Sequence, residues 1–224
     1  MREIKNINND WYFSNTAKTA PTSIPADWQN LTLPHTWNGT DGQDGGNDFH
    51  RGVCHYEIAL PSPTPGKRQY IEFRGANHIA TVSCNGTELG RHEGGFSTFR
   101  FELTQAMQPE NNILSVAVTN EVCHVYPQRA DFTFFGGLYR EVTFIETEQA
   151  HFDLLKDGTK GIFVTPRAPG STRIDLFPVD ADGCSVTVEL LDADGTCVAS
   201  DTAEAAEHTV LQLKVDAPRL WDGM

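Results

Sequence analysis

The chain has 224 residues, of which 39% are hydrophobic and 10% aromatic, so it can bury a core and is not a disordered segment. Its formal net charge of -13 argues against a nucleic-acid partner, because binding to phosphates needs clustered Lys and Arg. The same charge is repelled by anionic membrane surfaces.

The N-terminal residues 1–10 lack the apolar stretch of a secretory signal, and no window approaches a membrane span. We therefore expect a cytoplasmic protein without membrane attachment. The five cysteines, at positions 54, 84, 123, 184 and 197, are odd in number and form no CxxC or Cys/His metal spacing. This pattern predicts buried free thiols in a reducing compartment rather than disulfides or a zinc site.

Strand patterns recur at short intervals through the first 148 residues. They cover residues 53–60, 67–73, 80–84, 96–101, 112–119 and 138–145. Asn85-Gly86 is typical of a tight hairpin turn. The one helical turn expected is Leu103–Gln108, with Thr104 as its cap and Pro109 ending it. Many short strands separated by turn residues indicate a β-sandwich or jelly roll for residues 1–148.

A second series of strand patterns follows, in which the aromatic and Gly-rich character fades. It covers residues 151–154, 161–166, 171–179, 185–191, 197–200 and 209–215. Asp-Gly pairs beginning at positions 157, 182 and 194 provide turns between them. The pattern predicts an immunoglobulin-like β-sandwich over residues 149–224, which is shorter than the roughly 100 residues usual for that fold.

The segment Tyr126–Arg140 combines three Phe, a Gly pair and a lone Asp before an alternating strand pattern. Its part Asp-Phe-Thr-Phe-Phe-Gly-Gly-Leu-Tyr-Arg-Glu-Val closely resembles a signature of the sugar-binding domain of glycoside hydrolase family 2, the β-galactosidase and β-glucuronidase family. Three other segments agree in order: Leu33–Asn38, the Arg51-Gly52…Tyr56 entry to a strand, and Cys84–Ser97. The resemblance implies an all-β chain: a jelly-roll, galactose-binding-like sandwich followed by an immunoglobulin-like sandwich.

Enzymes of that family carry their two catalytic glutamates on a (β/α)₈ barrel that follows two β domains. Such a barrel needs about 250 residues of alternating strand and helix, which this chain does not contain. We therefore expect no catalytic residue in this chain and no activity for it alone. Pro218–Trp221 matches a family motif that precedes the last two strands of the second domain, so that domain is expected to be incomplete, with an open strand edge.

The resemblance implies the N-terminal, non-catalytic portion of a retaining β-galactosidase that hydrolyses terminal β-galactosides. The same region of a β-glucuronidase or β-mannosidase is the nearer alternative, and a free-standing carbohydrate-binding module is the alternative from another class. The expected partners are a galactoside, the catalytic barrel and a second copy in a homo-oligomer.

Asp131 is the first candidate for substrate binding. In β-galactosidases of the family, an Asp at this place in the signature helps to hold the galactose 6-hydroxyl, with sodium in some members. Sodium at Asp131, or Mg²⁺, is therefore expected only in an intact enzyme. Pairing of Asp131 with Arg129 or Arg140 is the purely structural alternative.

Asn47 and Asp48 are the second candidates, in a loop of four glycines and three Asp at residues 38–48. The loop lacks the acidic twelfth residue of an EF-hand. In the family, loops at this place face the active-site entrance. A solvated surface loop is the alternative.

Other residues with a plausible chemistry are better explained structurally. Asn120-Glu121 copies the dipeptide of the family's acid/base residue but ends a strand pattern, which predicts a solvated loop glutamate. His92 and Glu93 lack an evident Ser or Cys nucleophile. Sugar-stacking is conceivable for five aromatic residues, although core or inter-domain packing is expected for most of them: Trp37, Phe49, Phe132, Phe134 and Phe135.

Overall fold

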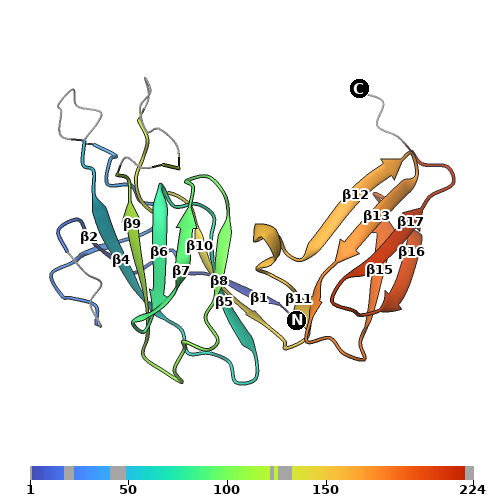
Figure 1. Cartoon of the computed structure of the whole chain (residues 1–224), viewed down its shortest axis with the longest axis horizontal. Helices are drawn as coiled ribbons and strands as arrows, with labels where there is room; N and C mark the ends of the chain where they lie inside the picture. The colour runs from blue at the N-terminus through green and yellow to red at the C-terminus, as the bar shows by residue number, and fades with distance from the viewer. Residues whose placement is uncertain (1, 18–22, 41–48, 122–123, 126–132, 220–224) are drawn as a thin grey trace. The chain divides into compact units, whose positions relative to one another are not determined.

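The computed structural model describes residues 2–17, 23–40, 49–121, 124–125 and 133–219. The chain divides into two compact units, Met1–Thr147 and Glu148–Met224 (Figure 1). All regular elements in the described ranges are strands, apart from a single 3₁₀ turn, Lys156–Gly158. Within those ranges there is therefore no helix of the length and hydrophobicity needed to cross a bilayer.

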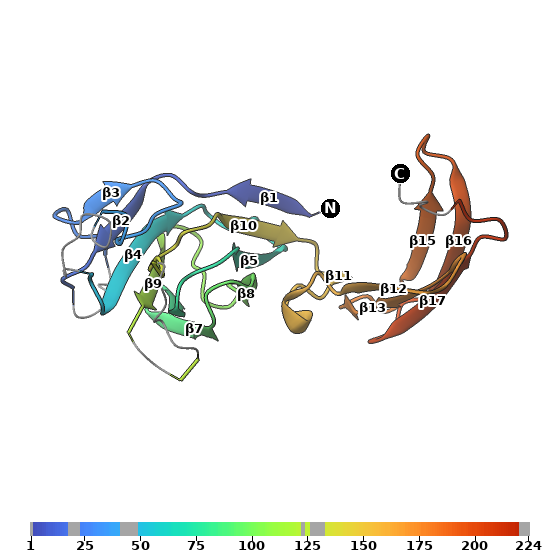
Figure 2. The same cartoon turned by 90° about the horizontal axis from the view of Figure 1, so that it is seen from above.

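The first unit is a sandwich of two antiparallel sheets, which Figure 2 shows as two layers. The smaller sheet has the order β1 (Glu3–Asn6), β10 (Val142–Thr147), β5 (Arg68–Phe73), β8 (Phe99–Glu102). The larger sheet has the order β3 (Gln29–Leu31), β2 (Trp11–Ser14), β4 (Val53–Leu60), β9 (Asn112–Thr119), β6 (Ile79–Cys84), β7 (Thr87–Glu93). Neighbouring strands are mostly distant in sequence, as the predicted jelly roll requires.

Alternation along the strands builds the core between these sheets. On β4, Cys54, Tyr56 and Ile58 point inward and are buried. Trp11, Phe73 and Phe144 join them with no exposed surface, and such aromatic burial supplies much of the hydrophobic stabilisation. Both residues of the Asn85-Gly86 turn have positive φ (50° and 80°), as a two-residue hairpin demands, which confirms that prediction.

The second unit contains three small sheets. They are the three-stranded sheet β12 (Ile162–Ala168), β13 (Ser171–Leu176), β17 (Thr209–Lys214), the hairpin β15 (Ser185–Leu191), β16 (Cys197–Glu204), and the short pair β11 (His151–Phe152), β14 (Pro178–Val179). Its core consists of Ile174, Leu176, Leu211 and Leu213, against which the β15–β16 hairpin packs. The three predicted Asp-Gly turns are confirmed, with φ of 66°, 72° and 88° at Gly158, Gly183 and Gly195.

Several predicted elements differ from the observed ones. The strand predicted from residue 138 begins at Val142, because the Leu138 carbonyl accepts a hydrogen bond from the His35 N–H instead of joining the sheet. The strand predicted at 171–179 is split into β13 and β14, because the Phe177 N–H between them donates to the Gly161 carbonyl. Residues 103–108 form the predicted helical turn, in which the Leu103 carbonyl accepts hydrogen bonds from the Ala106 and Met107 N–H groups, but Thr104 binds the Gln69 backbone instead of capping it. The pattern analysis did not identify strands β1, β2, β3 and β7.

The cysteines are only partly as predicted. Cys54 and Cys84 are buried free thiols, and burial raises their pKa values to about 12 and about 11. Cys184 and Cys197 are also free but exposed, which contradicts the prediction of burial. They lie at opposite ends of the small β15–β16 hairpin, which has too little covering layer to bury both faces of its strands. Cys123 lies outside the described residues.

Candidate functional site

Asp131, Asn47 and Asp48, the three predicted substrate-binding residues, lie outside the described residues. Phe132 does so as well. Their contacts with sugar, and a cation at Asp131, therefore stay predictions. The described residues that flank them do meet at one place in the first unit, at one end of the larger sheet. This place is the candidate site.

The side chain of Asn38 is the centre of this arrangement and is fully buried. Its Oδ1 accepts hydrogen bonds from the Gly136 N–H (2.8 Å) and from Asn120 Nδ2 (3.4 Å). Its Nδ2 donates to the His50 carbonyl (3.3 Å). One side chain thus joins both flanks of residues 41–48 to both flanks of the segment that holds Asp131.

Asn120 completes the network from the end of β9. Its Nδ2 donates to the His50 carbonyl (2.8 Å), and its Oδ1 accepts from the Gly52 N–H (3.0 Å). The Arg51 guanidinium donates to the Asn120 carbonyl (3.2 Å). Asn120 is fully buried, whereas Glu121 beside it is exposed. The dipeptide is therefore a structural anchor followed by a solvated glutamate, as predicted for Glu121.

Gly136 and Gly137 pack where a side chain has no room. A Cβ on Gly136 would lie 2.4 Å from the Trp37 ring, and one on Gly137 would lie 2.5 Å from Tyr56 Oη. The Gly137 φ of 116° also favours glycine. Gly137 and Asn77 exchange backbone hydrogen bonds of 2.9 and 3.0 Å. The Gly pair therefore fixes the end of the 126–135 segment against the aromatic core.

The residues after the Gly pair hold a second loop. The Tyr139 hydroxyl donates to the Gly95 carbonyl, and the Arg140 guanidinium donates to the Phe96 carbonyl (3.0 Å). Both signature side chains thus stabilise the backbone of residues 94–97. Arg140 also donates to the Arg74 carbonyl (3.3 Å).

The aromatic candidates take different positions. Trp37 stacks on Phe13, with ring centroids 6.2 Å apart, and packs against the core, as expected for a structural residue. The Arg51 guanidinium lies 5.0 Å from the centre of the Phe49 ring. Phe135 keeps 41% of its surface exposed, so it is the described aromatic residue of the signature that is most accessible to a ligand or to another domain.

His92 has a serine neighbour that the sequence did not suggest. Ser97 Oγ lies 3.2 Å from His92 Nε2, whereas the sequence showed no evident Ser or Cys partner for His92. The His92 ring stacks on Phe99 at 4.1 Å, and burial lowers its pKa. Glu93 instead contacts Arg91 (2.9 Å) and His124 (3.1 Å). Since no carboxylate among the described residues is shown to orient His92, the contact lacks the third member of a catalytic triad.

Two titratable residues on the outward side of β4 were not predicted. Glu57 is fully buried, and burial raises its pKa to about 7, although Ser115 Oγ donates to its Oε1 (2.9 Å). His55, two residues earlier, is 5% exposed, and burial lowers its pKa. Within the described ranges, neither His55 ring nitrogen nor Glu57 Oε2 has a hydrogen-bond partner. Their polar character in a strand pattern was the only signal in the sequence.

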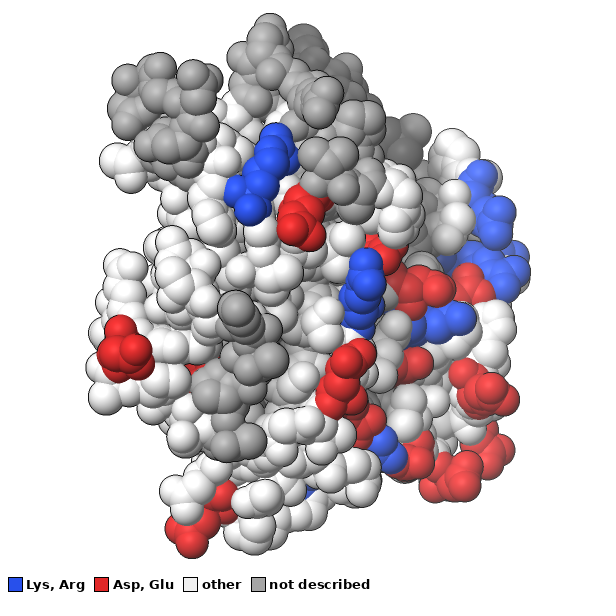
Figure 3. Space-filling model, turned by 60° about the vertical axis from the view of Figure 1, so that its left-hand side comes forward, with Lys and Arg blue, Asp and Glu red and all other residues white. Residues whose placement is uncertain are grey.

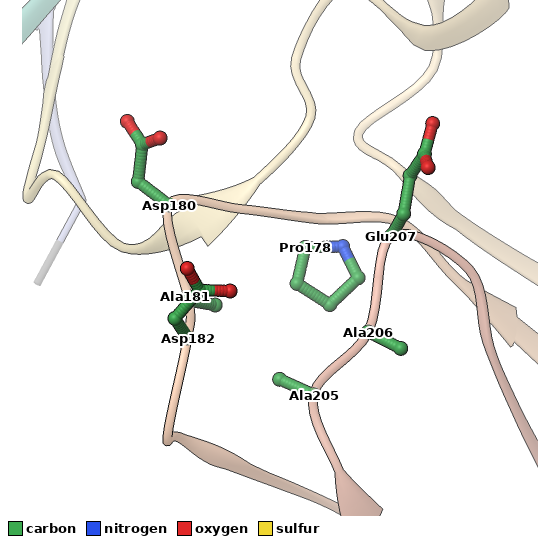
Figure 4. Close-up of a pocket in the computed structure, with 7 residues that line it drawn as sticks. All are labelled: Pro178, Asp180, Ala181, Asp182, Ala205, Ala206 and Glu207. Atoms are coloured by element: carbon green, nitrogen blue, oxygen red, sulfur yellow. The ribbon is translucent and has the colours of Figure 1, made fainter.

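Elsewhere the described surface offers less chemistry. A hollow of about 220 Å³ in the second unit is bordered by Asp180, Asp182 and Glu207, and Figure 4 shows the Asp180 and Glu207 carboxylates directed away from Ala205 and Ala206. In Figure 3, basic side chains lie among acidic ones without a continuous basic surface on the described part of that face. No group of three His, Cys, Asp or Glu side chains suited to a metal ion occurs among the described residues.

Comparison with known proteins identifies the family. Residues 2–148 match the family model described as "Glycosyl hydrolases family 2, sugar binding domain". The chain belongs to glycoside hydrolase family 2. This confirms the resemblance in the signature and assigns the Asn38 network to a family 2 sugar-binding domain.

Relatives of the family 2 chain extend over both units. A β-glucuronidase from Bacteroides fragilis is 32% identical over 97% of this chain and 33% of its own length. A β-galactosidase from Thermoanaerobacter pseudethanolicus is 25% identical over 98% of this chain and 31% of its own. The crystal structure of an FMN-binding β-glucuronidase from "Facaelibacterium prausnitzii L2-6" superposes with a TM-score of 0.82 and 37% identity, over 99% of this chain and 35% of that one. The chain thus spans about a third of the length of these relatives.

Replacement of the central amide should test the network. We expect Asn38→Ala to lower the free energy of unfolding of the first unit by about 2–4 kcal/mol, because it leaves the Gly136 N–H without its buried acceptor and removes an acceptor of the Asn120 amide. Urea denaturation followed by tryptophan fluorescence would measure this loss. A decrease below about 1 kcal/mol, the net value of an ordinary hydrogen bond, would contradict a central role. Thr36→Ala, which removes one part-buried bond to the Asn38 N–H, is the control.

Proposed function

We propose that these 224 residues form the non-catalytic, sugar-binding portion of a retaining family 2 glycosidase that acts on terminal β-glucuronides. The observation that carries the proposal is the similarity of nearly the whole chain to proteins named β-glucuronidase, at 32% and 37% identity. Hydrolysis with retention needs two carboxyl groups about 5 Å apart. In the proposal these belong to polypeptide outside this chain.

The role of the chain in this proposal is to hold binding loops at the rim of the sugar site. The Asn38 and Asn120 amides join the flanks of residues 41–48 and of the Asp131 segment in one buried network. Both loops would then present Asp131, Asn47 and Asp48 to the substrate from a rigid base. A cytoplasmic location and a homo-oligomeric enzyme remain part of the proposal.

A second candidate is a β-galactosidase. The Asp-Phe-Thr-Phe-Phe-Gly-Gly signature at residues 131–137 favours it, as does the relative named β-galactosidase at 25% identity. Both candidates share the family 2 scaffold and the retaining reaction. They differ in the group at C5 of the sugar, which is a carboxylate in a glucuronide and a hydroxymethyl group in a galactoside.

Chromogenic substrates separate these candidates. We expect no turnover of a β-glucuronide or a β-galactoside by the 224-residue chain. A longer polypeptide that contains it should hydrolyse the β-glucuronide with the higher kcat/KM, because enzymes discriminate substrates through this ratio. Preference for the galactoside would favour the second candidate. Failure of the longer polypeptide to cleave any β-glycoside, or turnover by this chain alone, would contradict the proposal.

A further inference from the structure

The outward face of the larger sheet in the first unit has a hollow of about 310 Å³. The hollow lies over β4, β9, β6 and β7, which are neighbours in this sheet and run side by side in Figure 1. Three of these strands, β4, β9 and β6, are paired with another strand on both sides. The floor of the hollow is therefore built from the interior of a sheet and not from a free edge.

Strand register and residue size explain the hollow. Two neighbouring cross-strand rows meet there, one formed by Val53, Thr119 and Ile79 and the other by His55, Ala117, Thr81 and Arg91. Both rows face outward, because residues that alternate with them along the strands, Cys54, Val118 and Ala80, are buried in the core. In the second row Ala117 and Thr81 are short, whereas the residues at its two ends are large. The hollow is the space above these short side chains.

His55 borders the hollow with a polar ring. It pairs with Ala117 across the sheet and follows Val53 by two residues, and both of these neighbours line the hollow. The residue is 5% exposed, and within the described ranges neither ring nitrogen has a hydrogen-bond partner. Because burial lowers the pKa of His55, the ring is neutral at about pH 7 and has one donor and one acceptor nitrogen. Such a ring suits hydroxyl groups, which both donate and accept hydrogen bonds.

The lining of the hollow combines donors, acceptors and apolar carbon. The Arg91 guanidinium has five N–H donors, and its contact with Glu93 (2.9 Å) uses only part of them. Glu121, which is exposed two residues after β9, supplies acceptor oxygens. The Thr119 hydroxyl accepts the Glu121 N–H (3.2 Å) and can donate its own proton. Val53 is 44% exposed and adds an apolar surface. A sugar ring has the matching pattern, with hydroxyl groups at its edge and C–H groups on its faces.

Charge and size narrow the ligand further. Among the described Lys, Arg, Asp and Glu side chains at the hollow, Arg91 is paired with Glu93, so Glu121 gives the rim a net negative charge. This charge repels a sugar that carries a carboxylate and leaves a neutral sugar unaffected. The volume lies at the lower end of the range of small-molecule pockets, about 300–1,000 Å³, and suits a single sugar unit.

We propose that the hollow over β4, β9, β6 and β7 is a carbohydrate site that binds one neutral sugar unit and is separate from the residues of the Asn38 network. Arg91, Glu121 and the threonine hydroxyls bind the sugar hydroxyls, while Val53 and Ala117 contact a C–H face of the ring. The site takes a neutral sugar whichever glycoside the enzyme hydrolyses, so it does not depend on the proposed function. A glycan held here and at the candidate site gains from a high effective concentration at the second contact.

Titration of the ¹⁵N-labelled chain, followed by NMR, locates a bound sugar. We expect methyl β-glucoside or methyl β-galactoside to shift the backbone amide signals of residues 53, 79–81, 91 and 117–121, with a dissociation constant of roughly 1 mM or weaker. The corresponding methyl β-glucuronide and β-galacturonide carry a carboxylate in place of the hydroxymethyl group. Each uronide should bind roughly tenfold or more weakly than its neutral counterpart, because the carboxylate meets Glu121.

Two Phe variants on one strand test the hollow itself. Thr81→Phe fills it and should raise the dissociation constant roughly tenfold or more. Ser83→Phe is the matched control, because Ser83 lies two residues further along the same face of β6, outside the lining, and should leave binding unchanged. Glu121→Gln removes the negative charge and should narrow the difference between each neutral glycoside and its uronide. The amide spectrum of each variant shows whether it is folded.

Three results would overturn the proposal. The first is the absence of shifts around the hollow with both neutral glycosides. The second is an equal effect of the two Phe variants on binding. The third is a set of shifts confined to Gly136 and Gly137, because the sugar would then lie at the candidate site and not in the hollow.

Discussion

Gly137→Ala should reduce the free energy of unfolding of the first unit by about 3–5 kcal/mol. A methyl group there would lie 2.5 Å from Tyr56 Oη and 2.8 Å from the His35 carbonyl. Neither atom can easily move away, because Tyr56 Oη and His35 Nδ1 are hydrogen-bonded to each other at 2.8 Å. The backbone φ of 116° adds strain for any residue with a Cβ. Urea denaturation monitored by tryptophan fluorescence measures this effect, since Trp11, Trp28 and Trp37 all belong to this unit.

Gly86→Ala provides the control for backbone strain alone. Gly86 has a φ of 80°, but no described atom lies within 4 Å of the position where its Cβ would be. We expect a loss of about 1–2 kcal/mol, the usual cost of a left-handed conformation in an L-residue. If both variants lost the same amount, steric contact at Gly137 would not explain its use in the signature.

Glu57→Gln should stabilise the first unit increasingly as the pH rises. The pKa of Glu57 is raised by burial from 4.5 to about 7, so the folded state holds its proton more tightly than the unfolded state does. The wild-type chain therefore loses stability as the pH rises from about 4.5 through about 7, and the loss is complete about one pH unit above the folded-state pKa. Over this interval it amounts to about 3 kcal/mol. Glutamine cannot ionise and avoids this loss.

The free energies of unfolding of the wild-type and Glu57→Gln chains are measured at about pH 5 and at about pH 8, on either side of most of this titration. The change in their difference between the two pH values gives the contribution of Glu57 ionisation. His55 contributes equally to both chains and cancels. The lowered pKa of His55 acts in the opposite direction, removing stability as the pH falls below 6.5, the ordinary pKa of histidine. Ser115→Ala should enlarge the wild-type pH dependence, because the Ser115 hydroxyl lowers the Glu57 pKa. A pH-independent effect of Glu57→Gln would show that the carboxyl is already charged in the folded state at the lower pH.

Local patterns predicted much of the secondary structure. The strands at 53–60, 112–119 and 185–191 have the predicted bounds, because their alternation and their flanking turn residues depend on local sequence. Leu138–Arg140 has an equally good strand pattern but forms none. Its polar groups bind His35, Gly95 and Phe96 instead, which are all distant in the sequence. Thr104 shows the same effect of a distant partner. Its hydroxyl accepts a hydrogen bond from the Gln69 N–H and is therefore not used to cap the turn that begins at Leu103.

The candidate site was predictable only in outline. The signature at residues 131–142 and the segment Leu33–Asn38 identify the family, and the match of residues 2–148 confirms it. The role of Asn38 was not predictable, because its partners come from segments that lie 12, 82 and 98 positions further along the chain. Asn120 appeared to belong to a copy of a catalytic dipeptide, and its burial shows that it is an anchor.

From the order of its residues alone, this chain can be recognised as an all-β member of glycoside hydrolase family 2, because turn chemistry and strand alternation depend on near neighbours. Folding in three dimensions decided which polar side chains of the described residues became buried partners and which were left without them, as Asn38 and His55 illustrate. These outcomes depend on contacts between distant strands, and their hydrogen-bond geometry and desolvation have no counterpart in a local pattern.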